Sequence, residues 1–587
     1  MRKTKIIATL GPKTCDVDSI RELIHAGVNA FRLNFSHGNH DTHIVSINNV
    51  KQVREELGMP IPIILDTKGP EIRTGVLKGN DDIKLNVGET FVLTTEEIEG
   101  DDKRVSVSYK NLPYDLKRGS RILIDDGLIE LKVKNLTNTE VECVIENGGM
   151  LGSTKGVNIP DVYVNLPALT DKDKSDIKFG SEQGVDYVAA SFVRCANDVI
   201  KMRQELELNG GGDIQIISKI ESRDGVDNID EILQVTDAIM VARGDLGVEI
   251  PTEEVPIVQK MLINKCNALG KPVVTATQML DSMIKNPRPT RAEASDVANA
   301  IFDGTSVIML SGETAKGDYP IQTVQMMDRI ARKAEATSEL YNLSMTNMEA
   351  KVSMTNAISH ATCSTARDLE AAAIVTITKS GHTARAVSKF KPRCPIVACT
   401  PDERVLRQLN LVWGCQPHLI EFDEQTTDDV FASAVAKAEE KGFAKQGDVV
   451  VLTAGVPVGV AGTTNILKVQ YVGNVLARGI GCGKKSITGK ASVIKVLDEA
   501  DKYFAKGDIL IAPKTDNSYL PYMKKASAII VEDSTAEENN HAAIVGRTLD
   551  IPVIIAAKNV AEAVRNATTI TVDSEKGLVY NGAVVKK

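Results

Sequence analysis

Short apolar runs rich in β-branched residues recur through the first half of the chain, and each ends in polar residues. Amphipathic stretches with helical spacing lie between them, as at Ser19–Ala26, Asp173–Glu182 and Glu293–Ile301. The eight apolar runs are Thr4–Thr9, Ala30–Phe35, Ile61–Asp66, Tyr187–Phe192, Gln215–Glu221, Ala238–Val241, Pro272–Thr277 and Ser306–Leu310. Nearly continuous apolarity is typical of parallel strands that are buried on both faces. The pattern therefore predicts an α/β fold with a (β/α)8 barrel, formed by residues 1–69 and 171–347.

Residues 70–170 interrupt this pattern with a different one. Apolar and polar residues alternate there at period two, with Gly and Asp at the turns, in six short runs: Ile83–Leu85, Phe91–Thr94, Val105–Ser108, Arg121–Ile124, Ile129–Val133 and Val141–Ile145. This alternation predicts a small inserted β-barrel domain. Because it would hang from the carboxyl end of a barrel strand, where such barrels carry their active sites, the insertion could close as a lid.

Two further α/β regions are predicted in the remaining chain. Residues 348–473 contain strand-like runs at Ala372–Thr378, Ile396–Thr400 and Val449–Thr453, with helical stretches between them. Residues 474–587 begin with a glycine-rich stretch and contain three more runs, at Ile509–Ala512, Ala528–Val531 and Val553–Ala556. We interpret the first region as a separate α/β domain and the second as an extra α/β module of swivelling type.

Composition narrows the class of protein. A chain of 587 residues is expected to form three to five domains. The net charge of −9 argues against a nucleic-acid binder. The nine cysteines contain no CxxC pair, which favours reduced thiols over a disulfide framework or a zinc site. No apolar run approaches the roughly 20 residues that cross a bilayer, and no signal peptide is evident. We therefore expect a cytoplasmic protein without membrane contacts.

Two acidic residues follow adjacent predicted strands of the barrel. Glu221 ends the fifth strand and Asp245 follows the sixth. Mg2+ typically binds one or two carboxylates together with water and substrate oxygens. The alternative for each carboxylate is an ion pair with Lys219 or Arg243. Two carboxylates at neighbouring strand ends favour the metal site.

A second group of oxygen-bearing side chains follows the second and third strands. Asn34, Ser36 and Asp66 would suit a monovalent cation, and a hydrogen-bonded loop clamp is an equally good interpretation. Arg32 and Lys219 bring positive charge to the same end of the barrel. Fixed cations near a metal are what phosphoryl transfer requires, because catalysis there consists mostly of positioning and charge neutralisation.

Three glycine-containing segments invite comparison with anion sites. Gly244-Asp245 follows a strand and opens a short helix, where free N–H groups could bind a carboxylate, although a plain turn is the alternative. The Thr378–Ala384 segment could form either a phosphate pocket or a capped turn. The Arg478–Ser486 stretch lacks the spacing of a phosphate loop, and we interpret it as a flexible linker.

Six segments, in order along residues 1–473, closely resemble the pyruvate kinase family. They are Phe31–Gly38, Leu65–Arg73, Ile217–Glu221, Val241–Gly247, Thr275–Leu280 and Met309–Thr314. The resemblance implies the reaction in which phosphoenolpyruvate and ADP give pyruvate and ATP. It also implies a lid domain, a regulatory third domain and a homotetramer. The residue patterns alone predicted only a barrel, a metal site and an anion site.

The resemblance further implies roles for individual residues. The predicted catalytic residues are Lys219, Thr277 and Arg32, and the substrate-binding residues are Arg32, Lys219, Gly244, Asp245 and Thr277. Glu221 and Asp245 would hold Mg2+ or Mn2+, whereas Asn34, Ser36, Asp66 and Thr67 would hold K+. Glu71 is similar to the residue of family members that need K+. The nucleotide, ADP or ATP, would contact Asn34, His37, Arg73 and Lys155.

The third domain of this family carries an allosteric loop for a phosphorylated small molecule. The loop corresponds to Thr378, Lys379, Ser380, Gly381, His382 and Thr383. Residues 474–587 resemble the mobile phosphohistidine domain of phosphoenolpyruvate-using dikinases, through the segment His541–Arg547 and Ile551–Val553. Glu537 and Glu538 stand just upstream and would repel a phosphohistidine. A structural or regulatory module is therefore favoured over a phosphorylated His541.

Two other functions are weighed against this assignment. A dikinase-like enzyme would pass phosphate through His541, but no segment resembles the separate nucleotide-grasp domain that it needs. A non-catalytic metabolite sensor would bind ligands in the barrel without turnover. The complete set of Lys219, Glu221, Asp245 and Thr277 argues against the sensor.

Overall fold

The structure is a computed structural model that describes residues 1–337, 353–422, 426–456 and 464–583. Contacts between residues divide the described chain into two compact units, which are described separately. The first unit contains the described residues of 1–360 and 378–421, and the second contains those of 361–377, 422–458 and 464–587. Within the described residues, no helix is both long and apolar enough to cross a membrane.

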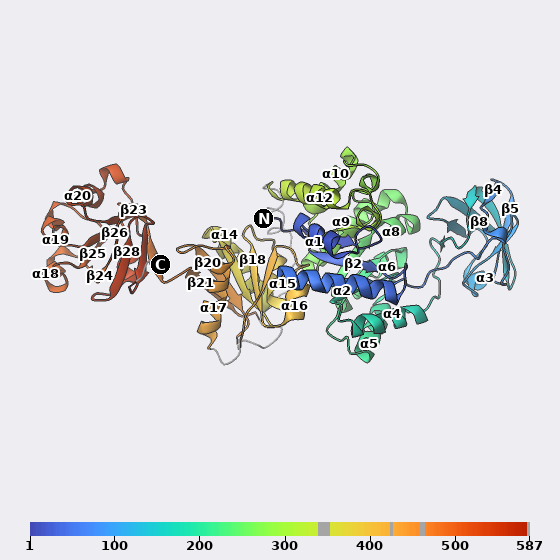
Figure 1. Ribbon diagram of the computed structural model, residues 1–587, viewed down its shortest axis with the longest axis horizontal. Coiled ribbons are helices and arrows are strands. Elements are labelled where there is room, and N and C mark those ends of the chain that lie inside the picture. Colours follow the sequence, from blue (N-terminus) through green and yellow to red (C-terminus); the bar gives the residue numbers. More distant parts are fainter. Residues whose placement is uncertain (338–352, 423–425, 457–463, 584–587) are drawn as a thin grey trace. The chain divides into compact units, whose positions relative to one another are not determined.

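Eight parallel strands close into a barrel at the centre of the first unit (Figure 1). Their order around the barrel is β1-β16-β15-β14-β13-β12-β3-β2. They are β1 (Lys5–Thr9), β2 (Ala30–Asn34), β3 (Ile63–Asp66), β12 (Tyr187–Ala190), β13 (Gln215–Ile220), β14 (Ala238–Ala242), β15 (Val273–Ala276) and β16 (Val307–Leu310). Each lies within one of the eight predicted runs or extends it by one residue. The predicted (β/α)8 barrel is therefore confirmed.

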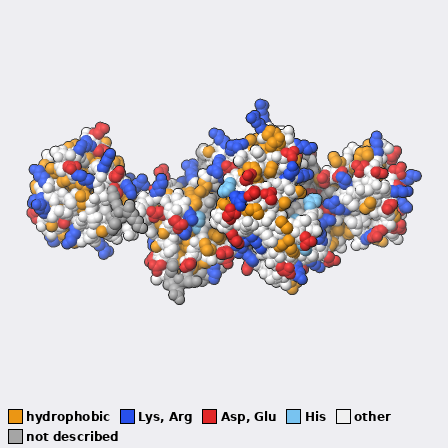
Figure 2. Space-filling view, in the orientation of Figure 1, with side chains coloured by type: hydrophobic (Ala, Val, Ile, Leu, Met, Phe, Trp, Pro, Cys, Tyr) orange, Lys and Arg blue, Asp and Glu red, His pale blue; other side chains and the backbone are white. Residues whose placement is uncertain are grey.

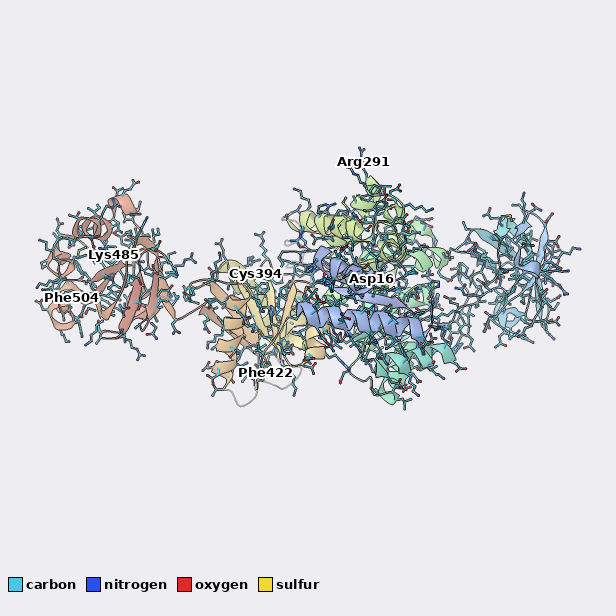
Figure 3. All side chains as sticks on the ribbon, in the orientation of Figure 1. Asp16, Arg291, Cys394, Phe422, Lys485 and Phe504 are labelled. Carbon is cyan, nitrogen blue, oxygen red and sulfur yellow. The ribbon has the colours of Figure 1, made fainter. Side chains whose placement is uncertain are left out.

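Helices cover the outside of the barrel strands (Figure 1). They are α1 (Val17–Ala26), α2 (His40–Leu57), α4 (Asp171–Glu182), α5 (Ala196–Leu208), α6 (Arg223–Asp227), α7 (Ile229–Val235), α8 (Arg243–Glu249), α9 (Val255–Leu269), α10 (Arg291–Phe302), α11 (Gly312–Ala315) and α12 (Pro320–Glu335). Side-chain caps define several starts: Asp16, labelled in Figure 3, accepts a hydrogen bond from the Ser19 amide at the start of α1. Asn39, Thr170 and Thr290 form capping boxes before α2, α4 and α10.

The insertion after β3 is an all-β domain, as predicted. Six strands pair in the order β11-β7-β8-β9-β5-β6, and β10 pairs with β4. They are β4 (Ile83–Leu85), β5 (Thr90–Thr94), β6 (Arg104–Ser106), β7 (Arg121–Ile124), β8 (Ile129–Leu136), β9 (Glu140–Asn147), β10 (Gly149–Leu151) and β11 (Val157–Asn158), with the short helix α3 (Leu112–Asp115). Single bridges from Arg73 to Gly156 and from Thr74 to Val107 connect the two edges of the six-stranded sheet, which gives it a barrel character.

The α/β region after the barrel contributes elements to both units. In the first unit, β18 (Ile396–Thr400) pairs in parallel with β19 (Cys415–Leu419), beside α15 (His382–Ser388) and α16 (Glu403–Leu409). In the second, β20 (Val449–Ala454) pairs in parallel with β17 (Ala373–Ile377) and antiparallel with β21 (Ile466–Tyr471). Helix α14 spans Met354–Asp368 and α17 spans Thr427–Glu440. The three strand-like runs predicted in this region are confirmed as β17, β18 and β20.

The C-terminal module is a mixed sheet with short helices. Its strand order is β22-β29-β28-β24-β25-β26-β27-β23. The strands are β22 (Val475–Arg478), β23 (Ile480–Cys482), β24 (Ser486–Val493), β25 (Ile509–Ala512), β26 (Ala528–Val531), β27 (Val553–Ile555), β28 (Thr569–Asp573) and β29 (Leu578–Asn581), and the helices are α18 (Ala500–Tyr503), α19 (Leu520–Met523), α20 (His541–Leu549) and α21 (Val560–Ala563). Basic and acidic side chains are interspersed on the face seen in Figure 2.

The interpretation of Arg478–Ser486 as a flexible linker is wrong. This stretch contains the end of β22, all of β23 and the start of β24. Its glycines serve close packing: a Cβ added at Gly481 would lie 1.9 Å from the Ser574 carbonyl oxygen. Lys485, labelled in Figure 3, forms an ion pair with Asp550 at 2.5 Å within the module. Glycine content alone did not distinguish a loose linker from a crowded backbone crossing.

Candidate active site at the carboxyl end of the barrel

Lys219 lies at the centre of a buried polar network at the carboxyl ends of the barrel strands. Its Nζ atom is 2.9 Å from Glu221 Oε1 and 3.2 Å from Asp66 Oδ1. It also donates a hydrogen bond of 2.8 Å to Ser191 Oγ. The Lys219 side chain is 12% exposed, and both carboxylates are 1% exposed. Residues that are far apart in the sequence therefore meet where β3, β12 and β13 end.

The charges of this network stabilise one another. Burial alone would lower the pKa of Lys219, but the Asp66 and Glu221 carboxylates raise it above its ordinary value. Burial would likewise raise the pKa of Asp66, but the Arg32 and Lys219 cations hold it below its usual range. Arg32 Nε lies 2.5 Å from Asp66 Oδ2, and its NH1 group donates to Thr9 Oγ1 at 3.1 Å. The Lys219 ammonium thus remains charged at this end of the barrel.

Glu221 has one oxygen that is fully bonded and one that is not. Its Oε2 atom accepts a hydrogen bond of 2.6 Å from the Phe192 amide. Its Oε1 atom is buried without a properly directed hydrogen bond, although the Lys219 ammonium is within ion-pair distance. Burial and the nearby Asp245 carboxylate raise the pKa of Glu221, whereas Lys219 opposes this shift. A cation held by Glu221 and Asp245 would give this oxygen a directed partner and reduce the repulsion between the two carboxylates, so these residues fit a divalent metal.

Asp245, Gly244 and Thr277 come together where β14 passes into α8. Thr277 follows β15 with a φ of +70°, in the left-handed region, and its carbonyl accepts a hydrogen bond of 2.7 Å from Arg243. A Cβ added at Gly244 would lie only 2.8 Å from Thr277 Cγ2, so the threonine packs directly on the first turn of α8. Arg243 also pairs with Asp296 at 2.8 Å, which secures this arrangement.

The four residues predicted to bind a monovalent cation lie on two neighbouring strand ends. Asn34 and Asp66 are opposite each other in the β2–β3 register, and the Phe35 amide donates to the Asp66 carbonyl at 2.9 Å. Asn34 Oδ1 accepts from the Ser36 amide at 3.1 Å, and the Thr67 carbonyl accepts from Ser191 Oγ at 2.6 Å. These oxygens have lone pairs beyond the bonds that they make, and Arg32 and Lys219 already neutralise Asp66. The set therefore fits a cation of low charge.

A cavity of about 350 Å3 lies between the inserted domain and the barrel. Arg73 and Lys155 line it from the insertion, and Asp245 lines it from the barrel. Arg73 pairs with Glu71 at 2.6 Å and Lys155 pairs with Asp125 at 2.9 Å. Asn34 and His37, the other two predicted nucleotide contacts, are not among the lining residues. The structure thus brings together Arg73, Lys155 and Asp245 but leaves the predicted nucleotide set incomplete.

The predicted effector loop precedes a short helix in the first unit. The Thr378 amide donates to the Cys399 carbonyl at 3.0 Å, and Gly381, with φ +81°, is the N-cap of α15. Arg385 donates to the Ser380 carbonyl at 3.1 Å. Thr378 and Thr383 are buried, whereas Lys379 and Ser380 are exposed. The start of α15 has no side-chain cap, and Arg385 occupies the Ser380 carbonyl.

Several residues of the barrel end were not among those predicted. Ser191 and Phe192 follow β12 and contact Lys219 and Glu221, and Asp126 lines the cavity from the lid. Burial, followed by repulsion from Asp245 and Asp125, raises the pKa of Asp126. Ser191 could have been found from its position near the end of the fourth predicted strand, as polar residues at the ends of the second, third, fifth and sixth strands were. Asp126 carries no such signal, because only folding brings the inserted domain to the cavity.

The fold and this network together define a (β/α)8-barrel protein with a buried cluster of charged side chains at the carboxyl end of the barrel. Two carboxylates and two cations lie at the end of the barrel that carries active sites in this fold, and residues of the inserted domain line the cavity there. No group of three or more His, Cys, Asp or Glu side chains in the described ranges is arranged to hold a metal. Two carboxylates suffice for Mg2+, which retains several waters.

Comparison with known families gives a specific assignment. Residues 1–324 match the family model "Pyruvate kinase, barrel domain", and residues 356–470 match "Pyruvate kinase, alpha/beta domain". Residues 504–577 match "PEP-utilising enzyme, mobile domain". The chain belongs to the pyruvate kinase family. The resemblance stated from the sequence is thereby confirmed, whereas the domain boundaries given there stay predictions.

Individual relatives extend over nearly the whole chain. The chain is 50% identical to a pyruvate kinase of Bacillus licheniformis and 49% identical to one of Geobacillus stearothermophilus, each over 99% of both chains. A crystal structure of a pyruvate kinase from Cryptosporidium parvum is 40% identical, with a TM-score of 0.76. It covers 80% of this chain and 96% of that one. The C-terminal module is therefore shared with the two bacterial relatives.

Proposed function

We propose that this protein transfers the phosphoryl group of phosphoenolpyruvate to ADP, giving pyruvate and ATP. The observation that carries the proposal is the Lys219 ammonium, buried between Asp66 and Glu221 at the carboxyl end of the barrel. A permanently charged ammonium in a site of low polarity stabilises a transferring phosphoryl group strongly. The names of the relatives, which are pyruvate kinases over their full length, support the same reaction.

Two cation sites accompany this function. Glu221 and Asp245 would hold Mg2+ or Mn2+, which supplies charge neutralisation at the phosphoryl and enolate oxygens when bound. Asn34, Ser36, Asp66 and Thr67 would hold K+, and Glu71 agrees with the K+-dependent members of the family. The Oε1 atom of Glu221, which lacks a directed hydrogen bond, supports the first site, and the neighbouring positions of Asn34 and Asp66 in the β2–β3 register support the second.

The side chains of the barrel then have distinct tasks. Arg32 binds the phosphoryl group of the substrate, and Lys219 neutralises its charge during transfer. The backbone at Gly244 and Asp245 holds the substrate carboxylate. Thr277, packed on the same turn, lies beside the enolate carbon and directs a proton to it through water. Protonation of the enolate makes the overall reaction strongly favourable.

The inserted domain supplies contacts to the nucleotide. We assign Arg73 and Lys155, together with Asn34 and His37, to the binding of ADP or ATP. Arg73 and Lys155 line the cavity that also reaches Asp245, which supports their part in this set. Closure of the lid over this cavity would exclude water, so that the phosphoryl group passes to ADP and not to solvent.

We assign a regulatory role to the loop of Thr378, Lys379, Ser380, Gly381, His382 and Thr383. A phosphorylated small molecule would bind its exposed hydroxyl, ammonium and amide groups. Burial, and then the Arg385 charge, lower the pKa of His382, which favours the neutral ring in this loop. The family resemblance suggests a cytoplasmic homotetramer as the working assembly.

The reaction is tested by coupling pyruvate formation to lactate dehydrogenase, with Mg2+ present and with K+ or choline as the monovalent ion. We expect turnover that requires ADP and Mg2+ and rises with K+. A Glu221→Gln variant should lose at least about a hundredfold in kcat, since loss of one electrostatic contact of this kind costs that much. It should also lose the Mg2+-dependent rise in melting temperature. Full activity in this variant would refute the metal assignment.

For His541 we infer a structural role in the C-terminal module. Its two ring nitrogens contact Thr515 Oγ1 at 3.1 Å and Asn517 Oδ1 at 3.3 Å, so both already have hydrogen-bond partners within the module. The histidine thus links the start of α20 to the segment after β25. A His541→Ala variant should retain full turnover of phosphoenolpyruvate and ADP. A loss of activity in a folded variant would instead support phosphate transfer through this residue.

A further inference from the structure

We propose that Ser191 is a positioning residue that couples the monovalent-cation site to Lys219. This inference rests on the proposed function, and it concerns a residue at the end of β12 to which no role has been assigned above. Ser191 is 6% exposed and lies between the predicted cation ligands of β3 and the lysine of β13.

Ser191 contacts both Lys219 on β13 and the predicted cation ligands at the end of β3. Its Oγ atom accepts a hydrogen bond of 2.8 Å from Lys219 Nζ. The same atom lies 2.6 Å from the Thr67 carbonyl oxygen and 3.3 Å from Asp66 Oδ1, and either oxygen can accept its proton. Its amide also donates to Thr67 Oγ1 at 3.2 Å. A hydroxyl can accept from an ammonium and donate to a carbonyl or carboxylate through the same oxygen atom.

The hydroxyl carries a single proton, but two acceptors lie within its reach. In the structure the shorter contact is with the Thr67 carbonyl. A monovalent cation that takes this carbonyl would compete with the proton, which can turn to Asp66 Oδ1. That oxygen is the one that pairs with Lys219 at 3.2 Å. A hydrogen bond from the Ser191 hydroxyl to Asp66 Oδ1 would weaken the ion pair between Asp66 and Lys219. The Lys219 ammonium would then interact more strongly with the phosphoryl group.

The packing around Ser191 limits which substitution can remove the hydroxyl without disturbing its neighbours. A Cβ added at the neighbouring Gly69 would lie 2.8 Å from Ser191 Cβ, so the backbone passes close to the serine. Replacement by alanine keeps the Cβ and removes only Oγ, whereas threonine would add a methyl group to a crowded position. Ser191→Ala is therefore the variant of choice.

We expect Ser191→Ala to lower kcat about tenfold to a hundredfold at saturating K+, the range for one hydrogen bond to a charged group. KM for phosphoenolpyruvate should change less than about threefold, because Arg32 and Lys219 remain. The stimulation of kcat by K+ over choline should fall by at least half. The binding of K+, followed as the rise in melting temperature with K+ at constant ionic strength, should be retained.

Ser218→Ala provides a matched control on the adjacent strand. Ser218 is fully buried next to Lys219, but its hydroxyl pairs with Thr236 Oγ1 at 2.8 Å, away from the network. This variant also loses one buried hydroxyl and should keep both its kcat and its K+ stimulation. An equal fall of kcat in both variants would mean that any lost hydroxyl disturbs the barrel, and it would overturn the proposal.

Two further results would also refute the coupling. If Ser191→Ala keeps the K+ stimulation of the unmodified protein, the serine does not transmit the cation's effect. If the K+-dependent rise in melting temperature disappears, Ser191 is part of the cation site itself. The proposed reaction fails separately, if the unmodified protein shows no turnover of phosphoenolpyruvate and ADP.

Discussion

Two buried lysines in the same unit illustrate opposite responses to burial. At the carboxyl end of the barrel, Lys219 lies between Asp66 and Glu221, and its pKa is raised. At the opposite end, Lys391 donates a hydrogen bond of 2.6 Å to the Gly304 carbonyl, just before β16, and lies 5.0 Å from the centre of the Trp413 ring. Lys391 forms no ion pair within the described part of the chain, and burial lowers its pKa to about 7.

The difference shows what keeps a charge inside a protein. Both side chains are removed from water, which disfavours the ammonium form in each case. Only Lys219 has carboxylates at contact distance, and they more than offset this penalty. A neutral amine suffices for packing against Gly304 and Trp413. A permanent positive charge is needed at the proposed site of phosphoryl transfer, and Lys219 supplies one there.

The largest expected effect comes from removing the charge of Lys219. Lys219→Met should lower kcat more than about a thousandfold, because it removes the ammonium that neutralises the transferring group and leaves two buried carboxylates without their shared partner. Steady-state turnover with saturating Mg2+ measures the loss. Circular dichroism should confirm that the variant is folded.

Lys391→Met is the control for this comparison. It also removes a buried ammonium, but at the end of the barrel that has no predicted catalytic residues. We expect its kcat to stay within about threefold of the unmodified protein. A comparable loss of turnover in both variants would mean that a buried lysine is needed for stability in general, and the contrast between the two sites would fail.

A smaller effect is expected on the pH dependence of stability. Between the native pKa of Lys391, about 7, and its ordinary value of 10.5, the native state binds fewer protons than the unfolded state. By linkage, Lys391 therefore makes stability rise as pH increases through this window. In Lys391→Met the melting temperature should rise less between pH 7 and 10, by several degrees. The rise need not vanish, since burial also lowers the pKa of Lys3 and Lys5 to about 8.

Asn267→Asp sharpens the same measurement by supplying a carboxylate. Asn267 donates to the Gly304 carbonyl at 3.0 Å, so both its amide and the Lys391 ammonium bind the same oxygen. An aspartate of the same shape should raise the pKa of Lys391 and reduce the pH-dependent gain in stability. A melting profile like that of the unmodified protein would contradict the physical reason given for the contrast.

The sequence predicted much of the barrel and part of its site. All eight strands were found from apolar runs, because strands covered on both faces leave a strong local signal. Arg32, Asp66, Lys219 and Glu221 were predicted at one end and do lie together there. Ser191 was missed, because it stands inside an apolar run that continues into Phe192 and Val193.

Elsewhere, local pattern was misleading. The glycine-rich Arg478–Ser486 stretch was interpreted as a linker, yet it forms strands whose glycines allow close backbone contacts. A glycine in the sequence shows only that no side chain is present at that position. Whether that absence serves flexibility or close approach depends on which distant segment, here Ser574, lies against it.

The sequence by itself determined the barrel, the β insertion and which strand ends carry charge. The reason is that the order of apolar and polar residues along a strand follows which of its faces are buried. The tertiary structure decided which of those side chains remain charged in the folded protein. That outcome depends on distances of about 3 Å between strands that are more than a hundred residues apart, as for Lys219 and Asp66. The same distances leave Glu221 Oε1 without a directed donor and place one serine hydroxyl between two acceptors. Such contacts have no signature in local periodicity.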